Sequence, residues 1–105
     1  MIHEIIKNLL DSLNVDYSNN TYSGYNKQYI IYSIYNGKGD DYADNDNLSV
    51  THYITISLWG DSVEENNIYK EIIKLFKENN FIYESEREVQ DQNKFGITID
   101  FMYNN

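Results

Sequence analysis

Four aspartates in one loop-like segment are the first residues whose spacing could support chemistry. Residues 36–47 read NGKGDDYADNDN and carry carboxylates at positions 40, 41, 44 and 46. A calcium loop of the EF-hand type needs oxygen ligands at its positions 1, 3 and 5 and a glycine at 6. Counting from Asp44 puts Leu48 fifth and Ser49 sixth, and counting from Asp40 puts Tyr42 third. The calcium pattern fails, so we expect a solvated acidic loop and no metal site, with a weak nonspecific cation site as the alternative.

The residue types that commonly catalyse reactions are scattered. The two histidines, His3 and His52, fall on different predicted elements, and the chain has no cysteine. Ser57 or Ser49 could be drawn into a Ser-His-Asp triad, but no nucleophile elbow or oxyanion loop supports one. Gly37-Lys38-Gly39 is too short for a phosphate-binding loop. We therefore predict a protein that is not an enzyme and holds no cofactor.

Charge and hydropathy exclude two classes of partner. The chain has 8 basic and 17 acidic residues, a formal net charge of −9, and Arg87 is its only arginine. Nucleic-acid binding needs clustered lysine and arginine, so specific binding to DNA or RNA is not expected. No apolar run approaches the ~20 residues of a membrane span, and no signal peptide is visible. We expect no membrane partner.

The segment from Val50 to Asn80 is predicted to form the strand and helix around which the other elements pack. Residues 50–59 alternate, with Ile54, Ile56 and Leu58 on one face and Tyr53 and Trp59 on the other. This period of 2 predicts a strand with one buried face. After Gly60-Asp61 the period becomes 3.6, and Ser62 and Glu65 have capping-box spacing. Residues 63–80 are therefore predicted to be an amphipathic helix.

The flanking segments complete the predicted fold. An apolar stripe predicts a first helix over residues 2–13, with Asn14 as its left-handed stop. Residues 16–28 are a long connection or contain a short extra strand. Further strands are predicted at Tyr29–Tyr35, Phe81–Glu86 and Phe95–Tyr103, with a charged loop over residues 87–94. The length of 105 residues predicts one domain, 1–105, of the α+β class. We expect a four-stranded mixed or antiparallel sheet with two helices packed on one face, in the order α-β-β-α-β-β.

Aromatic side chains mark one face of the predicted sheet. Tyr53 and Trp59 lie on the less apolar side of their strand, and Tyr29 and Tyr35 share one side of theirs. Exposed Tyr and Trp are frequent interface anchors. The alternative is that these rings pack under a helix. We predict a subunit interface at these four residues.

The order of these elements resembles the tail terminator proteins of long-tailed bacteriophages, also called tail completion or head–tail joining proteins. The resemblance runs from the first amphipathic helix through most of the chain. Its most specific part is a tyrosine-alanine-acidic loop that leads into an alternating tyrosine-isoleucine strand. The matching segments are Tyr22-Ser23-Gly24, Tyr29–Tyr35, Tyr42-Ala43-Asp44, Tyr53–Trp59, Asn79-Asn80-Phe81 and Lys94-Phe95.

The resemblance implies a structural assembly protein of the virion. Such a subunit forms a ring, commonly a hexamer, that caps the tail tube and joins it to the head connector. It would be assembled in the host cytoplasm and reside at the head–tail interface, with DNA passing through the lumen without specific binding. We expect Asp40, Asp41, Tyr42, Asp44 and Asp46 to face the tube, the connector or the lumen. The alternative function is a small acidic inhibitor or immunity-type protein that binds a basic protein target.

Overall fold

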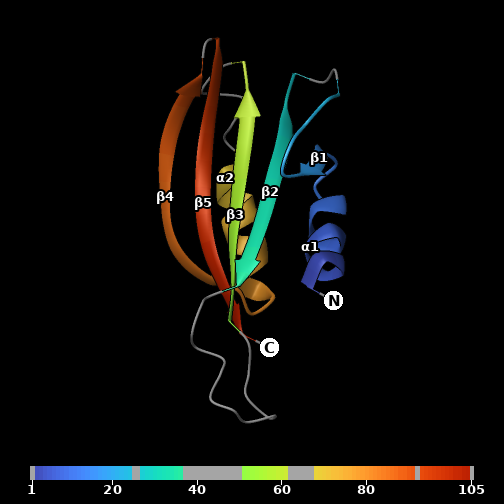
Figure 1. Ribbon diagram of the computed structural model, residues 1–105, viewed down its shortest axis with the longest axis vertical. Helices are drawn as coiled ribbons and strands as arrows, with labels where there is room; N and C mark the ends of the chain where they lie inside the picture. The colour runs from blue at the N-terminus through green and yellow to red at the C-terminus, as the bar shows by residue number, and fades with distance from the viewer. Residues whose placement is uncertain (1, 25–26, 37–50, 62–67, 92, 105) are drawn as a thin grey trace.

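A mixed β-sheet organises the part of the chain that the structure describes. The computed structural model describes residues 2–24, 27–36, 51–61, 68–91 and 93–104. The helices in these ranges are α1 (Ile2–Asp11) and α2 (Tyr69–Glu78). The strands lie side by side in the order β1-β2-β3-β5-β4, and all neighbours are antiparallel except β1 and β2 (Figure 1). The strands are β1 (Asp16–Asn19), β2 (Tyr29–Asn36), β3 (Thr51–Gly60), β4 (Ile82–Asp91) and β5 (Lys94–Asn104).

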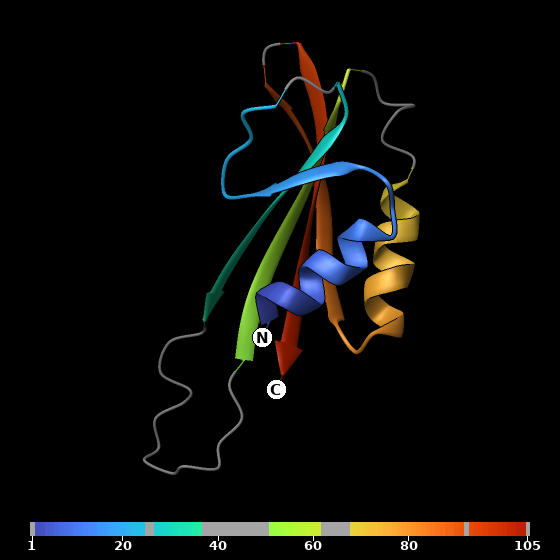
Figure 2. The same ribbon diagram turned by 90° about the vertical axis from the view of Figure 1, so that its right-hand side faces the viewer.

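The predicted architecture is wrong in its strand number and in its order of elements. The described residues form five strands instead of four, and the order is α-β-β-β-α-β-β instead of α-β-β-α-β-β. The first helix therefore does not precede a simple hairpin, because β1 lies between α1 and β2 and pairs parallel with β2. Figure 2 shows α1 and α2 on the same side of the sheet, with β1 crossing near α1.

The extra strand β1 forms because its tyrosine ties the sheet edge to the first helix. The Tyr17 hydroxyl donates a hydrogen bond to the Asp11 carboxylate of α1 at 2.6 Å, and its ring lies beside that of Tyr32. The hydrogen bond to Asp11 raises the pKa of Tyr17 to about 12. Asn20 then ends the strand with a positive φ of 69°, a conformation that asparagine tolerates. These contacts are tertiary, and the polar segment carries no alternation that would reveal them.

The hairpin of β4 and β5 is longer than predicted. Residues 87–91 belong to β4, and Lys94 already belongs to β5, where a charged loop over residues 87–94 was expected. Arg87 pairs with Thr98 and Glu88 with Ile97 across the two strands. β4 is an edge strand, where exposed charged side chains are common. The charged composition that suggested a loop is therefore that of a sheet edge.

The core lies between the helices and one face of the sheet. The Phe76 ring of α2 stacks on Phe101 of β5 at a centroid distance of 4.9 Å and meets the edge of Phe81 at 4.8 Å. Burial of this apolar surface is the main favourable term in folding. The buried residues that form the core are Ile2, Ile6, Leu10, Ile30, Tyr32, Ile54, Ile56, Leu58, Ile72, Phe76, Phe81, Ile97, Ile99 and Phe101.

Replacing Phe76 with alanine tests this core. The Phe76→Ala variant should lose about 3–5 kcal/mol of unfolding free energy, because a fully buried ring leaves a cavity beside Phe101. Urea unfolding measures the loss. The matched control is Lys74→Ala on the exposed side of the same helix, which should change the free energy by less than about 0.5 kcal/mol. Equal losses in the two variants would show that Phe76 is not central to the core.

The half-buried His52 makes stability depend on pH. Desolvation lowers the pKa of His52 below its usual 6.5. As the pH falls from 7 to 5, the histidine of the unfolded chain takes up a proton first, so acid favours unfolding. The free energy of unfolding should therefore fall more steeply in the wild type than in the His52→Gln variant. Urea unfolding at pH 7, 6 and 5 measures both slopes, and identical slopes would contradict this assignment.

Candidate functional site: the open face of the sheet

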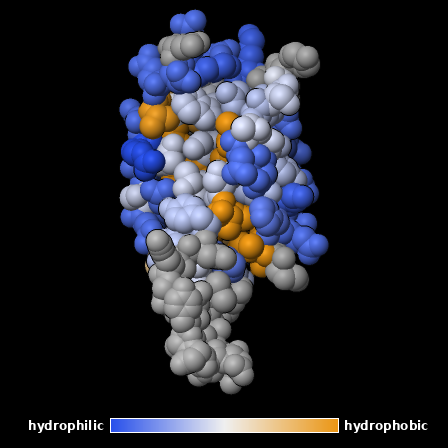
Figure 3. Space-filling view, in the orientation of Figure 1, coloured by the Kyte–Doolittle hydropathy of each residue, from blue (hydrophilic) through white to orange (hydrophobic). Residues whose placement is uncertain are grey.

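One face of the sheet points away from both helices, and we call it the open face. Figure 1 looks onto it, with α2 behind the strands. The strand registers place Tyr29 beside Trp59 and Tyr35 beside Tyr53 on this face. Figure 3 shows hydrophobic residues in separate patches on it, between more polar ones. By register, its residues are Tyr29, Ile31, Ser33, Tyr35, Tyr53, Thr55, Ser57, Trp59, Ile82, Ser85, Arg87, Val89, Gly96, Thr98, Asp100 and Met102.

At one end of the open face, Tyr29 and Trp59 are held by contacts within the chain. Tyr29 stacks on Tyr22 with ring centroids 4.0 Å apart, and the Lys94 ammonium lies 5.7 Å from the Tyr29 centroid. Trp59 covers Gly96, where an added Cβ would lie 2.8 Å from the indole. The glycine thus lets the indole lie flat on the sheet. This end is structurally organised before any partner arrives.

At the other end, aromatic and aliphatic side chains are more exposed. Tyr35 and Tyr53 stack at a centroid distance of 5.7 Å, and Tyr35 is 59% exposed. Met102 pairs with Tyr53 on one side and with Ile82 on the other, and Ile82 is 45% exposed. Tyr35 and Ile82 are the exposed large hydrophobic residues of the described chain. We call Tyr35, Tyr53, Ile82 and Met102 the apolar end.

The four predicted interface residues therefore share a face but form two clusters. Tyr29 and Tyr35 are six residues apart on β2, a separation of about 20 Å in an extended strand. Trp59 and Tyr53 are likewise at opposite ends of the same face, because β3 runs antiparallel to β2. The prediction that these residues share one face is consistent with the strand registers. The distance within each strand follows from the sequence, whereas the pairing of Tyr29 with Trp59 and of Tyr35 with Tyr53 follows only from the register between the strands.

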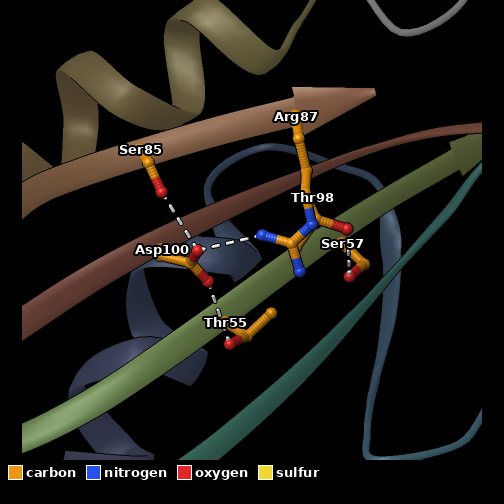
Figure 4. Close-up of polar contacts among 6 residues, drawn as sticks. All are labelled: Thr55, Ser57, Ser85, Arg87, Thr98 and Asp100. Atoms are coloured by element: carbon orange, nitrogen blue, oxygen red, sulfur yellow. Dashed lines mark hydrogen bonds and ion pairs between the residues drawn. The ribbon is translucent and has the colours of Figure 1, made fainter. Parts of the chain in front are cut away.

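A polar network lies between the two clusters and was missed by sequence reasoning. The Asp100 carboxylate accepts hydrogen bonds from Thr55 at 3.2 Å and from Ser85 at 3.1 Å (Figure 4). Arg87 donates to the same carboxylate at 3.1 Å, with Arg87 60% and Asp100 28% exposed. The hydroxyls of Ser57 and Thr98 lie 3.1 Å apart. The sequence did carry one signal for this network. Thr55 and Ser57, and likewise Thr98 and Asp100, are two residues apart, so each pair of polar side chains lies on one face of its strand.

The role of this polar network is structural. Asp100 is surrounded by donors from β3 and β4, an arrangement that ties three strands together. The Ser57 hydroxyl bonds Thr98 on the open face, whereas His52 lies on the opposite face of β3 by the alternation of the strand. Ser57 and His52 therefore do not form part of a triad. Ser49, the other serine considered, lies outside the described residues.

The acidic loop prediction falls outside the part of the chain that the structure describes. Asp40, Asp41, Tyr42, Asp44 and Asp46 all belong to residues 37–50. Among the described residues, no group of three or more His, Asp and Glu could hold a metal ion. No helix within the described ranges is long and apolar enough to cross a membrane.

Gly96 offers a direct test of the organised end. In the Gly96→Ala variant the new methyl should lift Trp59 off the sheet, because the two would otherwise overlap at 2.8 Å. Trp59 is the only tryptophan, so its fluorescence emission should shift to longer wavelength and become more sensitive to acrylamide quenching. Thr98→Ala, on the next outward position of β5, should leave the spectrum unchanged. An unshifted spectrum in Gly96→Ala would count against the close packing.

Comparison with known proteins adds no family to this geometry. Neither a scan against protein-family models nor a search of curated proteins finds a match for this chain. A proposal for the function therefore rests on the open face, on the charge of the chain and on the resemblance of its sequence to tail terminator proteins.

Proposed function

We propose that this chain is a structural assembly protein of the phage tail-terminator type, which acts as a ring and not as an enzyme. The observation that carries the proposal is the apolar end of the open face, where Tyr35 and Ile82 are exposed beside Tyr53 and Met102. The ring would cap the tail tube and join it to the head connector, in agreement with the resemblance of the sequence. Six copies is the expected number.

The open face has the composition of a protein–protein contact. Aromatic residues, methionine and arginine are enriched at interfaces, and tyrosine offers a large contact area with few rotatable bonds. Four strands of about eight residues present roughly 500 Å². A standard interface buries about 800 Å² on each partner. The open face therefore suits one part of a subunit contact, and a second surface must add to it.

The charge of the chain fits a conduit for DNA. A subunit of net charge −9 repels phosphate, so DNA would pass through a ring of such subunits without being held. The acidic residues at 40, 41, 44 and 46, with Tyr42, remain our predicted contact with the tube, the connector or the lumen. In this proposal the protein assembles in the host cytoplasm and resides at the head–tail interface of the virion.

An acidic inhibitor is the second candidate, and the edge strand β4 favours it. Glu84, Glu86 and Glu88 are all exposed on β4 and could face a basic protein target. Such an inhibitor needs no closed oligomer. The mass of the free protein therefore separates the two candidates, since a ring gives one closed multiple of the subunit mass and an inhibitor gives a monomer or dimer.

The assembly test combines native mass measurement with a double substitution at the apolar end. The wild-type chain should form a closed oligomer, visible as rings by electron microscopy. The Tyr35→Ser, Tyr53→Ser variant should shift to monomer, because it removes the stacked pair without touching the core. Lys7→Ala on the exposed side of α1 is the control and should assemble as the wild type does. A wild-type chain that stays monomeric at high concentration overturns the proposal.

A further inference from the structure

Helix α2 presents a stripe of lysines on an otherwise acidic chain. Lys70, Lys74 and Lys77 are exposed and spaced i, i+4, i+7, so they share one side of the helix. Ile72 and Phe76, which bury the helix, occupy the opposite side. Three of the eight basic residues of the chain are thus gathered in about 10 Å of helix. We call these three residues the lysine stripe.

A shallow groove runs beside the lysine stripe. Its volume is about 340 Å³, and it is lined by the half-buried Ile73, by the three lysines and by Glu78. Apolar Ile73 beside three lysines suits a protein partner that carries acidic side chains. The carboxylate of Glu78 makes the groove less suited to a free polyanion, which would bring only negative charge.

The edge strand β4 carries a complementary row of charge. Glu84, Glu86 and Glu88 are exposed within about 13 Å of strand. Glu86 and Glu88 pair with Ile99 and Ile97 and so lie on the helix side of β4, and Glu84 lies at the register shift between Tyr83 and Ser85. β4 lies at the end of the sheet order, so its outer edge also presents backbone donors and acceptors. We call these three glutamates the acidic edge.

Neither surface is neutralised within the described chain. The ion pairs found among the described residues join Arg87 to Asp100 and Lys94 to Asp61. They include no lysine of the stripe and no glutamate of the acidic edge. Two copies of a −9 chain repel each other, so a stable contact between copies needs opposite charges placed face to face.

We infer that the lysine stripe of one copy binds the acidic edge of a neighbouring copy. The inference rests on the proposed function for its partner, a second copy of this chain, and it supplies the additional surface that the open face requires. The contact joins two different surfaces, so repetition closes a ring when the rotation permits. The contact is rich in exposed charge, so added salt should weaken it.

Charge exchange between the two surfaces tests the inference. The α2 variant carries Lys70→Glu, Lys74→Glu and Lys77→Glu, and the β4 variant carries Glu84→Lys, Glu86→Lys and Glu88→Lys. Each alone should raise the concentration needed for assembly at least about tenfold, because three attractive pairs become repulsive. An equimolar mixture of the two variants should assemble, because each supplies the surface that the other has lost. Native mass measurement gives the oligomeric state of the α2 variant, the β4 variant and their mixture.

A combined variant controls for net charge. It carries all six substitutions, keeps the net charge of −9, and should assemble by itself with the polarity of the contact reversed. Lys7→Glu with Lys27→Glu, both exposed and outside α2 and β4, adds negative charge elsewhere on the chain and should assemble normally. Thermal unfolding verifies that every variant is folded.

The outcomes separate this inference from the proposed function. A closed wild-type oligomer that persists in the α2 and β4 variants overturns the inference and leaves the ring intact. A wild-type dimer that follows the charge-exchange pattern supports the inference and overturns the ring. A wild-type monomer overturns both.

Discussion

The alternation of side chains along β3 is the constraint on which the rest of the structure depends. β3 pairs with β2 on one side and β5 on the other, and its Ile54, Ile56 and Leu58 are almost fully buried. A slip of one residue would carry these side chains to the open face and bring Tyr53 and Trp59 under the helices. The composition of the open face is therefore a consequence of the core, since the same register determines both.

This dependence explains which parts of the fold could be predicted. The strands at the centre of the sheet carry a clean period of 2, and β3 begins at Thr51 and ends at Gly60, within one residue of the prediction. Asn14, the predicted left-handed stop after the first helix, has a φ of 59°. At the sheet edges the signal is weaker, because β1 and the outer half of β4 bury little and are held by pairing with a neighbour. A short extra strand within residues 16–28 was one of two alternatives, which β1 confirms, whereas the outer half of β4 was predicted to be a loop. Tyr17 illustrates the difficulty, since its partner Asp11 belongs to another element.

The candidate site likewise has features that the sequence predicts and features that it does not. Parity within each strand, which a sequence displays, puts Tyr29 with Tyr35 on one face of β2 and Tyr53 with Trp59 on one face of β3. That the two pairs share one face, and that they meet as Tyr29 with Trp59 and Tyr35 with Tyr53, follows from the register between the strands, which a sequence does not display. The network around Asp100 joins β3, β4 and β5 and exists only when the β3–β5 and β4–β5 registers are both set. Its hydrogen bonds favour that alignment over a slipped one, so the polar centre helps to hold the two apolar clusters in place.

The net charge of the chain limits how these surfaces can act together. Copies of a −9 subunit approach each other against repulsion, and the open face, about 500 Å² in all and only partly apolar, provides little free energy to overcome it. In the proposed contact, the lysines of α2 would reduce that repulsion by lying against carboxylates of the neighbour, and β4 offers three within a similar length. Apolar attraction at the open face is nonspecific in direction, whereas charge pairing is specific. A directional contact is what distinguishes a closed ring from an aggregate, so the proposed ring would need both surfaces.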